Sequence, residues 1–102
     1  MKAIADICVI PITGQLSVRE PVARAHQILK AAGLETHLHA YGTNVQGELH
    51  DVLAAIEKVH ETLHAEGIPR LSTTIKLGTR TDKDADMAAK VQVVQDLLDQ
   101  DG

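Results

Sequence analysis

The sequence has no tryptophan and no phenylalanine, and Tyr41 is its single tyrosine. Aliphatic side chains must therefore form the core of the 102-residue chain, 44% of which is hydrophobic. Small domains with thin cores often bury further surface by self-association. The scarcity of aromatic rings also removes the stacking platform that binders of unpaired bases use. We expect a single domain over residues 1–102 that assembles with copies of itself.

The sequence also lacks a second cysteine, a basic stripe and a long apolar run. Cys8 is the only cysteine, so no disulfide can form within the chain. The net charge is −4, and Lys and Arg are scattered, which argues against a nucleic-acid partner. Asp6 interrupts the N-terminal apolar segment before a signal-peptide core can form, and no apolar run reaches the length of a membrane span. The pattern predicts a cytoplasmic protein without a membrane partner.

The hydrophobic periodicity alternates between strand-like and helix-like segments. Residues 3–12 are rich in Ile and Val, while 34–41 and 68–80 alternate with a period of two. Residues 43–46, between Gly42 and Gly47, form the second arm of a tight hairpin. These four segments are the predicted strands.

Three segments repeat their apolar residues at helical intervals. The first ends at Gly33 and begins with a capping box at Ser17 and Glu20, or at Pro21. The second covers 48–66, and the third runs through 87–98 after Asp82 and Asp84, which are placed to cap it. The resulting order is an α+β, ferredoxin-like βαββαβ sandwich with an additional C-terminal helix and a four-stranded antiparallel sheet.

Strand 3–12 is apolar on both sides, although the first two helices can cover only one face of such a sheet. An isolated monomer would expose the other face as an apolar patch. The sequence therefore predicts that a homodimer or homotetramer covers this face.

His60-Glu61-Thr62-Leu63-His64 matches the H-E-x-x-H pattern of zinc peptidases. His60, however, lies near the centre of the apolar stripe of its helix, and no third helical ligand follows. We expect His60 to be partly buried and hydrogen-bonded near the core, with no metal site. A metal-dependent hydrolase using His60, Glu61 and His64 stays a less favoured alternative.

Polar side chains gather on the predicted open face of the sheet. His37, His39 and Tyr41 alternate along one strand, and Ser72, Thr74 and Lys76 alternate along another. They indicate either a hydrated subunit contact or a ligand pocket. Asp6, a carboxylate in an apolar strand, must be paired, hydrated or functional, whereas Cys8 reads as a buried, inert thiol.

Several short segments, in order, resemble a family of small ferredoxin-like proteins that bind thiamine or its hydroxymethylpyrimidine part. They are the segment 6–12, Gly42-Thr43 with Gly47 at the hairpin, His60, Gly67, and the segment 74–77 leading to Arg80. The family hairpin is similar to P-M-G-T-x-I-E-G, whereas residues 40–47 read A-Y-G-T-N-V-Q-G. The resemblance implies dimers or tetramers joined through open sheet faces, ligand capture and no catalysis.

An aminopyrimidine offers ring acceptors and an amino donor, and thiamine adds a cationic thiazolium. A receptor therefore needs hydroxyls or amides, an acceptor and a wall. The predicted ligand-binding residues are Asp6, His37, Tyr41, Thr43, Gln46, Thr74 and Lys76, with no catalytic residue, metal or cofactor. The alternatives are a regulatory or scaffolding homo-oligomer without a small ligand and, less favoured, a protein that binds a metal through its histidines, such as His37 and His39.

Overall fold

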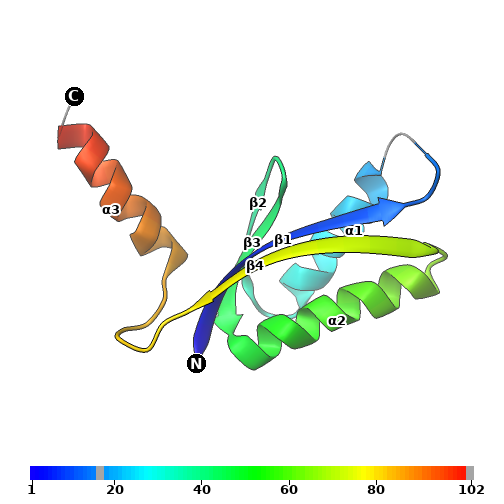
Figure 1. Ribbon diagram of the computed structural model, residues 1–102, viewed down its shortest axis with the longest axis horizontal. Helices are drawn as coiled ribbons and strands as arrows, with labels where there is room; N and C mark the ends of the chain where they lie inside the picture. Colours follow the sequence, from blue (N-terminus) through cyan, green and yellow to red (C-terminus); the bar gives the residue numbers. More distant parts are fainter. Residues whose placement is uncertain (16–17, 101–102) are drawn as a thin grey trace.

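The computed structural model describes residues 1–15 and 18–100. Its elements follow the predicted order, and the ferredoxin-like α+β arrangement with an additional C-terminal helix is confirmed (Figure 1). The strands are β1 (Lys2–Ile12), β2 (Glu35–His39), β3 (Gly42–Glu48) and β4 (Arg70–Thr79). The helices are α1 (Arg19–Ala31), α2 (Leu49–Ala65) and α3 (Met87–Gln100).

The four strands form one antiparallel sheet in the order β2-β3-β1-β4. The long β1 lies in the middle, with Asp6 opposite Asn44 of β3 on one side and opposite Lys76 of β4 on the other. A two-residue connection, Ala40-Tyr41, joins β2 to β3, as the predicted tight hairpin requires. This register decides which side chains share a face.

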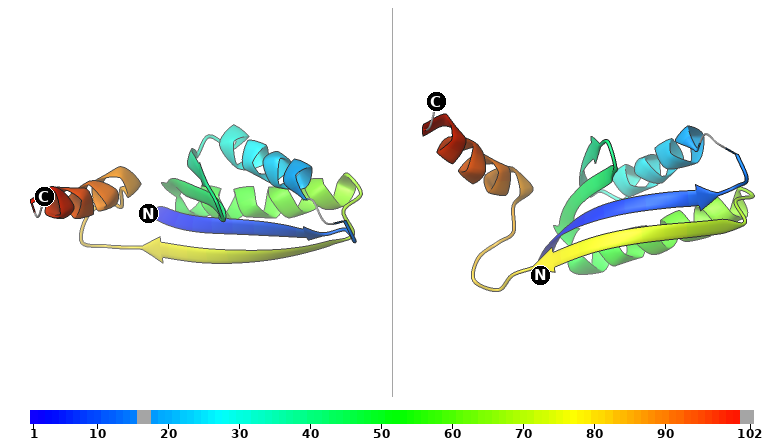
Figure 2. Two further views of the ribbon diagram at one scale, coloured as in Figure 1. Left: turned by 90° about the horizontal axis from the view of Figure 1, so that it is seen from above. Right: turned by 45° about the horizontal axis from the view of Figure 1, so that its top comes forward.

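Alternate residues of β1 point toward α1 and α2, which both lie on the same side of the sheet (Figure 2). The core lies between these layers and is aliphatic, as the sequence predicts. Its most deeply buried large side chains are Ile7, Leu29, Leu63, Val45, Val52 and Val59. The opposite side of the sheet, here called the open face, carries the other half of β1.

The start of α1 differs from the sequence expectation. The helix begins at Arg19, and Val18 at the N-cap makes no side-chain capping bond. Pro21 is tolerated in the first turn because its missing N–H would have no helical partner there. Ser17 of the predicted capping box lies outside the described residues.

The helix α3 stands apart from the sandwich (Figures 1 and 2). Its N-terminus is capped by Asp86, whose Oδ1 accepts the Ala88 N–H at 3.2 Å. The prediction that Asp82 and Asp84 cap this helix is therefore wrong, because the helix begins later, at Met87. Within residues 1–15 and 18–100, no helix has the length and apolarity needed to cross a bilayer.

Candidate functional site

A row of polar side chains crosses the middle of the open face, one from each strand. Asp6 pairs with Asn44 and Lys76, and Asn44 pairs in turn with His37. Directly paired residues of antiparallel strands lie on the same face, so these four side chains are neighbours. The row contains a carboxylate, an amide, an ammonium and an imidazole, which together can donate and accept hydrogen bonds.

Asp6 is held by His39 from the end of β2. The His39 Nε2 lies 2.6 Å from Asp6 Oδ1, and the Tyr41 backbone N–H donates to His39 Nδ1 at 3.2 Å. Because Nδ1 accepts, the ring proton is on Nε2, which donates to the carboxylate. The side chains of His39 and Asp6 are 33% and 45% exposed, so solvent still reaches the pair. One oxygen of Asp6 is thus oriented and the other is available to a ligand.

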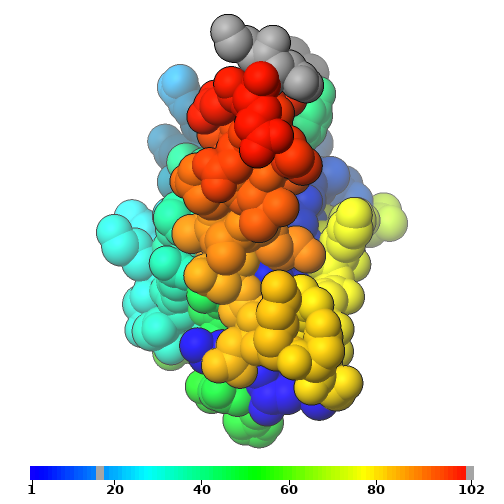
Figure 3. All heavy atoms as spheres, turned by 90° about the vertical axis from the view of Figure 1, so that its left-hand side faces the viewer, coloured from blue at the N-terminus to red at the C-terminus, as the bar shows by residue number. Residues whose placement is uncertain are grey.

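A cavity of about 920 Å³ adjoins this row at one end of the sheet. Ile4 and Gly78, which line it, are the next pair along the open face from Asp6 and Lys76. The opposite wall comes from residues 79–80 and 82–86 and from Ala89, Lys90 and Val93 of α3. In Figure 3, α3 (orange to red) and the segment before it (yellow) stand in front of the sheet. The volume falls within the roughly 300–1,000 Å³ of small-molecule sites.

Charges of both signs line the segment that closes this cavity. Arg80 donates from Nε to Asp82 Oδ1 at 2.6 Å and from Nη2 to Asp82 Oδ2. The hydrogen bond from Arg80 lowers the pKa of the Asp82 carboxyl to about 2. Lys83 and Lys90 line the same cavity. The three acidic residues of the lining, Asp82, Asp84 and Asp86, are balanced by three basic ones, so the cavity carries no excess charge of either sign.

Gln46 lies on the open face, where its side chain forms a hydrogen bond to the start of α3. Its Oε1 accepts the backbone N–H of Met87 at 2.5 Å. That N–H belongs to the first turn of α3 and has no partner within the helix. Gln46 thus ties the start of α3 to the open face, beside the cavity that α3 lines.

Thr43 lies on the other side of the sheet from Asp6 and the polar row. It is 5% exposed, pairs with Ile7 and Leu38 on the helix-covered face, and its hydroxyl lies 3.1 Å from His26 Nδ1 of α1. Thr43 therefore cannot join Asp6 in one pocket on the open face.

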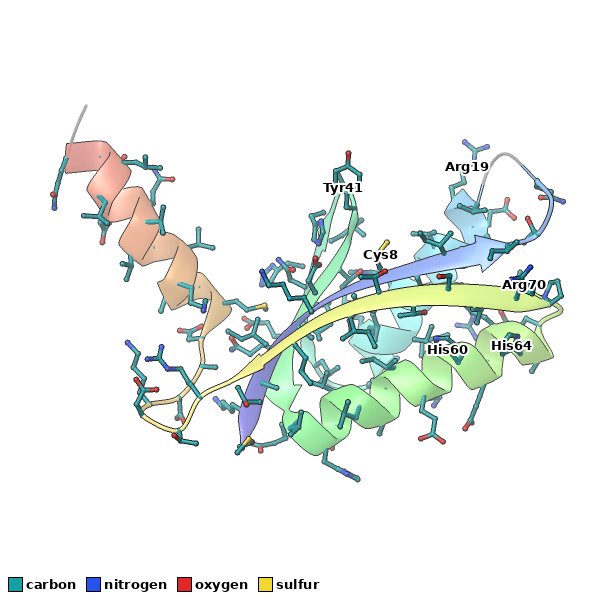
Figure 4. The ribbon with its side chains drawn as sticks, viewed as in Figure 1. Cys8, Arg19, Tyr41, His60, His64 and Arg70 are labelled. Atoms are coloured by element: carbon teal, nitrogen blue, oxygen red, sulfur yellow. The ribbon has the colours of Figure 1, made fainter. Side chains whose placement is uncertain are left out.

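Three further predicted residues, Thr74, His37 and Tyr41, lie at three separate places. Thr74 pairs with Cys8, one pair along from Asp6 and Lys76. His37 is in the polar row, and its side chain is 63% exposed. Tyr41 lies at the tip of the hairpin, 84% exposed and away from the row (Figure 4).

Cys8 is half-buried on the open face, where the sequence suggested a buried thiol. A smaller hollow of about 210 Å³ lies beside it, between α1, the end of β1 and the hairpin. Tyr41 and Thr43 both line this hollow, but the rest of its lining is mainly aliphatic, so it offers few polar anchors.

The H-E-x-x-H segment forms hydrogen bonds within the chain. His60 Nε2 lies 2.7 Å from Thr73 Oγ1 on the helix-facing side of β4, so the predicted hydrogen bond of His60 is confirmed. His64 donates from Nδ1 to the Ile68 carbonyl at 2.8 Å, and the two rings meet edge to face (Figure 4). Across residues 1–15 and 18–100, no group of three or more His, Cys, Asp or Glu is arranged to hold a metal ion.

Asn44 of the polar row, and His39, which holds Asp6, were not among the predicted site residues. Only the register of β1 and β3 shows that Asn44 is a direct neighbour of Asp6. His39 shares the alternation of His37, which placed it on the right face, but its bond to Asp6 depends on the hairpin geometry.

The model of the thiamine-binding protein family matches residues 5–95. Among curated proteins, the UPF0045 protein sll0230 of Synechocystis is 41% identical over 97% of this chain and 82% of its own length. The UPF0045 protein ECM15 of Eremothecium gossypii is 33% identical over 96% of this chain and 94% of its own length.

Two solved structures share the fold. The hypothetical protein MJ1052 of Methanocaldococcus jannaschii is 26% identical, with a TM-score of 0.85 over 92% of this chain and 96% of that one. A Thermotoga maritima protein described as a candidate for thiamine biosynthesis or salvage is 17% identical, with a TM-score of 0.82 over 92% of this chain and 99% of its own.

Proposed function

We propose, from the premise that this chain belongs to the thiamine-binding protein family, that it captures thiamine or its hydroxymethylpyrimidine moiety without converting it. The proposed site is the polar row of the open face together with the adjoining cavity of about 920 Å³. The oriented carboxylate of Asp6, held by His39 beside that cavity, carries the proposal.

The polar row suits the edge of an aminopyrimidine. The oxygen of Asp6 that His39 does not engage can accept from the amino group, and the amide of Asn44 can donate to a ring nitrogen. A hydrogen bond to a charged group is the stronger kind, so Asp6 gives the main polar anchor. Thr74 and His37 lie at the margins of this row.

The charges around the site favour the pyrimidine over the cationic thiazolium. Lys76 lies directly opposite Asp6, and the three aspartates of the cavity are matched by three basic side chains, so no excess negative charge awaits the thiazolium. Gln46 stands where the family hairpin has an acid, so one negative charge is missing. We expect hydroxymethylpyrimidine to be held at least as well as thiamine.

Capture of the ligand requires only positioned donors, acceptors and charges, and no covalent bond is made or broken.

The lone Cys8 suits a cytoplasmic location, where thiols stay reduced.

Titration calorimetry with both compounds tests the proposal. Asp6→Asn should weaken binding by ~1.5–3 kcal/mol, or roughly one to two decades in affinity, because a charge-assisted bond is lost. Thr74→Ala should weaken binding less. Glu57→Gln is the matched control, since Glu57 is an exposed carboxylate on α2, on the other side of the sheet. No heat from either compound at hundred-micromolar concentration, in folded protein, would refute ligand capture.

A scaffolding role is the second candidate, favoured by the apolar part of the open face. Ile10 and Ile12 are 48% and 40% exposed there, which suits a contact between copies. We propose a homodimer or homotetramer in either case. Light scattering at micromolar concentration should therefore give a mass well above 11.0 kDa, and a monomer mass would refute the assembly.

A further inference from the structure

A cavity of about 350 Å³ lies next to the larger cavity beside Asp6. It is lined by the first residues of the chain and by the segment that joins β4 to α3. Figure 3 shows the start of the chain (blue) next to this segment (yellow to orange). The linings of the two cavities share Arg80, Lys83, Asp84 and Ala85. The smaller cavity therefore extends the site beside Asp6 toward the N-terminus.

The charge of this smaller cavity is positive, in contrast to the balanced charge of the larger one. Within the described part of the chain, its lining combines three basic side chains, Lys2, Arg80 and Lys83, with a single carboxylate, that of Asp84. We call it the basic cavity. Arg80 binds the nearby Asp82 through Nε and Nη2, and its guanidinium has further N–H donors on Nη1. An anionic group is therefore the kind of group that the basic cavity attracts.

Glu48, a further carboxylate near the basic cavity, is paired with the N-terminus. It lies opposite Lys2 in the register of β1 and β3. Its Oε2 accepts a hydrogen bond from the α-ammonium group of Met1 at 3.1 Å. The ammonium group thus offsets the charge of Glu48, so this carboxylate does not cancel the positive charge of the basic cavity.

Alternate residues of β1 lead from the polar row to the basic cavity along the open face. Asp6 is followed on this face by Ile4 and then by Lys2. On β4, Gly78 lies opposite Ile4, and Arg80 follows two residues later, just beyond the end of the strand. Asp6 and Lys2 are four residues apart, which corresponds to about 14 Å along a strand. The carboxylate anchor and the basic cavity are therefore the two ends of one straight path.

The floor between these two ends is low and apolar. Ile4 and Gly78 form it, and both line the larger cavity. Gly78 has no side chain, and no heavy atom of the described residues lies within 4 Å of a Cβ added there. This leaves space for a flat ring that rests on the sheet between the two ends.

We infer that the site takes a phosphate ester of thiamine, with the pyrimidine at Asp6, the thiazolium over Gly78 and the phosphate in the basic cavity. This assignment rests on the proposed function of the polar row. Lys2, Lys83 and Arg80 donate charge-assisted hydrogen bonds to the phosphate oxygens. The phosphate also brings the negative charge that the balanced larger cavity does not offer to the thiazolium.

A phosphate ester of hydroxymethylpyrimidine is too short to join the two ends. Its phosphate is attached through one methylene to the pyrimidine ring, whereas the two ends of the path are about 14 Å apart. A phosphate group should therefore raise the affinity of thiamine more than that of hydroxymethylpyrimidine.

Titration calorimetry with thiamine and thiamine monophosphate tests the assignment. The readout is the ratio of the two dissociation constants in wild type, Lys2→Gln, Lys83→Gln and Lys58→Gln. Lys58 is exposed on α2, on the other side of the sheet, so Lys58→Gln is the matched control that removes the same charge elsewhere. Circular dichroism identical to wild type verifies that each variant is folded.

We expect wild type to bind the monophosphate about tenfold more tightly than thiamine, because charge-assisted hydrogen bonds are added. Lys2→Gln and Lys83→Gln should each reduce this preference about twofold to fivefold, the range of exposed charge pairs. Lys58→Gln should leave the preference as it is in wild type.

Equal affinities for thiamine and its monophosphate in wild type would overturn the phosphate site and leave the capture of thiamine intact. A preference that falls as much in Lys58→Gln as in Lys2→Gln would also overturn it, because net charge would then be the cause. So would a gain for hydroxymethylpyrimidine phosphate over hydroxymethylpyrimidine as large as the gain for thiamine. Absence of heat from every compound would refute the phosphate site and the proposed function together.

Discussion

The Nε2–H of His39 donates to the carboxylate of Asp6 at 2.6 Å and so joins the hairpin to the central strand. Replacing His39 with Ala removes this bond. Because both side chains are about a third or more exposed, we expect a stability loss of only ~0.5–1 kcal/mol in urea unfolding. Ligand affinity should fall more, about tenfold, since Asp6 loses its orientation. Equal effects of His39→Ala and His37→Ala on affinity would contradict this role.

His60 is expected to stabilise the fold through its hydrogen bond to Thr73. His60→Ala removes the bond and leaves a partly filled space between α2 and β4. We expect a loss of ~1–3 kcal/mol in the free energy of unfolding, measured by urea denaturation. The exposed His64 is the control, and His64→Ala should cost less. Metal analysis showing one zinc per chain, lost in His64→Ala, would instead favour the hydrolase alternative.

Gly42 marks a close approach between β3 and β1. A Cβ at this position would lie 2.5 Å from the Ile7 carbonyl oxygen, a backbone atom that cannot move aside alone. Gly42→Ala should therefore destabilise the protein by ~1–3 kcal/mol. Gly78→Ala is the control because no heavy atom lies within 4 Å of its added Cβ. A thermal unfolding midpoint that drops equally in both variants would contradict the clash.

Asp82 should remain ionised in acid, since the hydrogen bond from Arg80 lowers the pKa of its carboxyl to about 2. A lowered pKa in the folded state favours folding above the ordinary value of 3.8, and this contribution is lost as pH falls toward 2. Carboxyl-carbon NMR should show Asp82 titrating near pH 2, below the ordinary value of 3.8. In Arg80→Gln its titration should return to the ordinary range, and an unchanged midpoint would disprove the pairing.

The sequence predicted the helices and strands, and it predicted which residues of β1 share a face, because period-two and helical patterns directly report burial. It also placed Asp6 and Lys76 on one face, which the register of β1 and β4 makes direct neighbours. The grouping of Thr43 with Gln46 ignored the same rule. Residues three apart in a strand point to opposite faces, so only one of them can reach the open face.

The position of α3 could not be predicted from periodicity. The apolar pattern of α3 indicates that one side of the helix is buried, but it does not indicate which surface covers that side. The segment before it carries Asp82, Asp84 and Asp86, each a suitable cap by residue type. Only the three-dimensional contacts show that Asp86 is the one used and that Gln46 meets Met87.

Gln46→Glu separates the structural role of this position from its role in ligand choice. The residue accepts the Met87 N–H at the positive end of the α3 dipole, where a carboxylate is more favourable than an amide. We therefore expect the variant to be as stable as wild type or more stable, by ~0.3–1 kcal/mol at neutral pH. The gain should fade as acid protonates the new carboxyl.

Because the added charge lies on the open face, Gln46→Glu should also raise the affinity for thiamine relative to hydroxymethylpyrimidine. Gln92→Glu, on the polar side of α3, introduces the same charge away from the helix start and the row. Urea unfolding at neutral and acidic pH, with calorimetry of both compounds, measures the two effects. If Gln92→Glu shifts the thiamine preference as much as Gln46→Glu does, the preference reflects net charge and not a group at position 46.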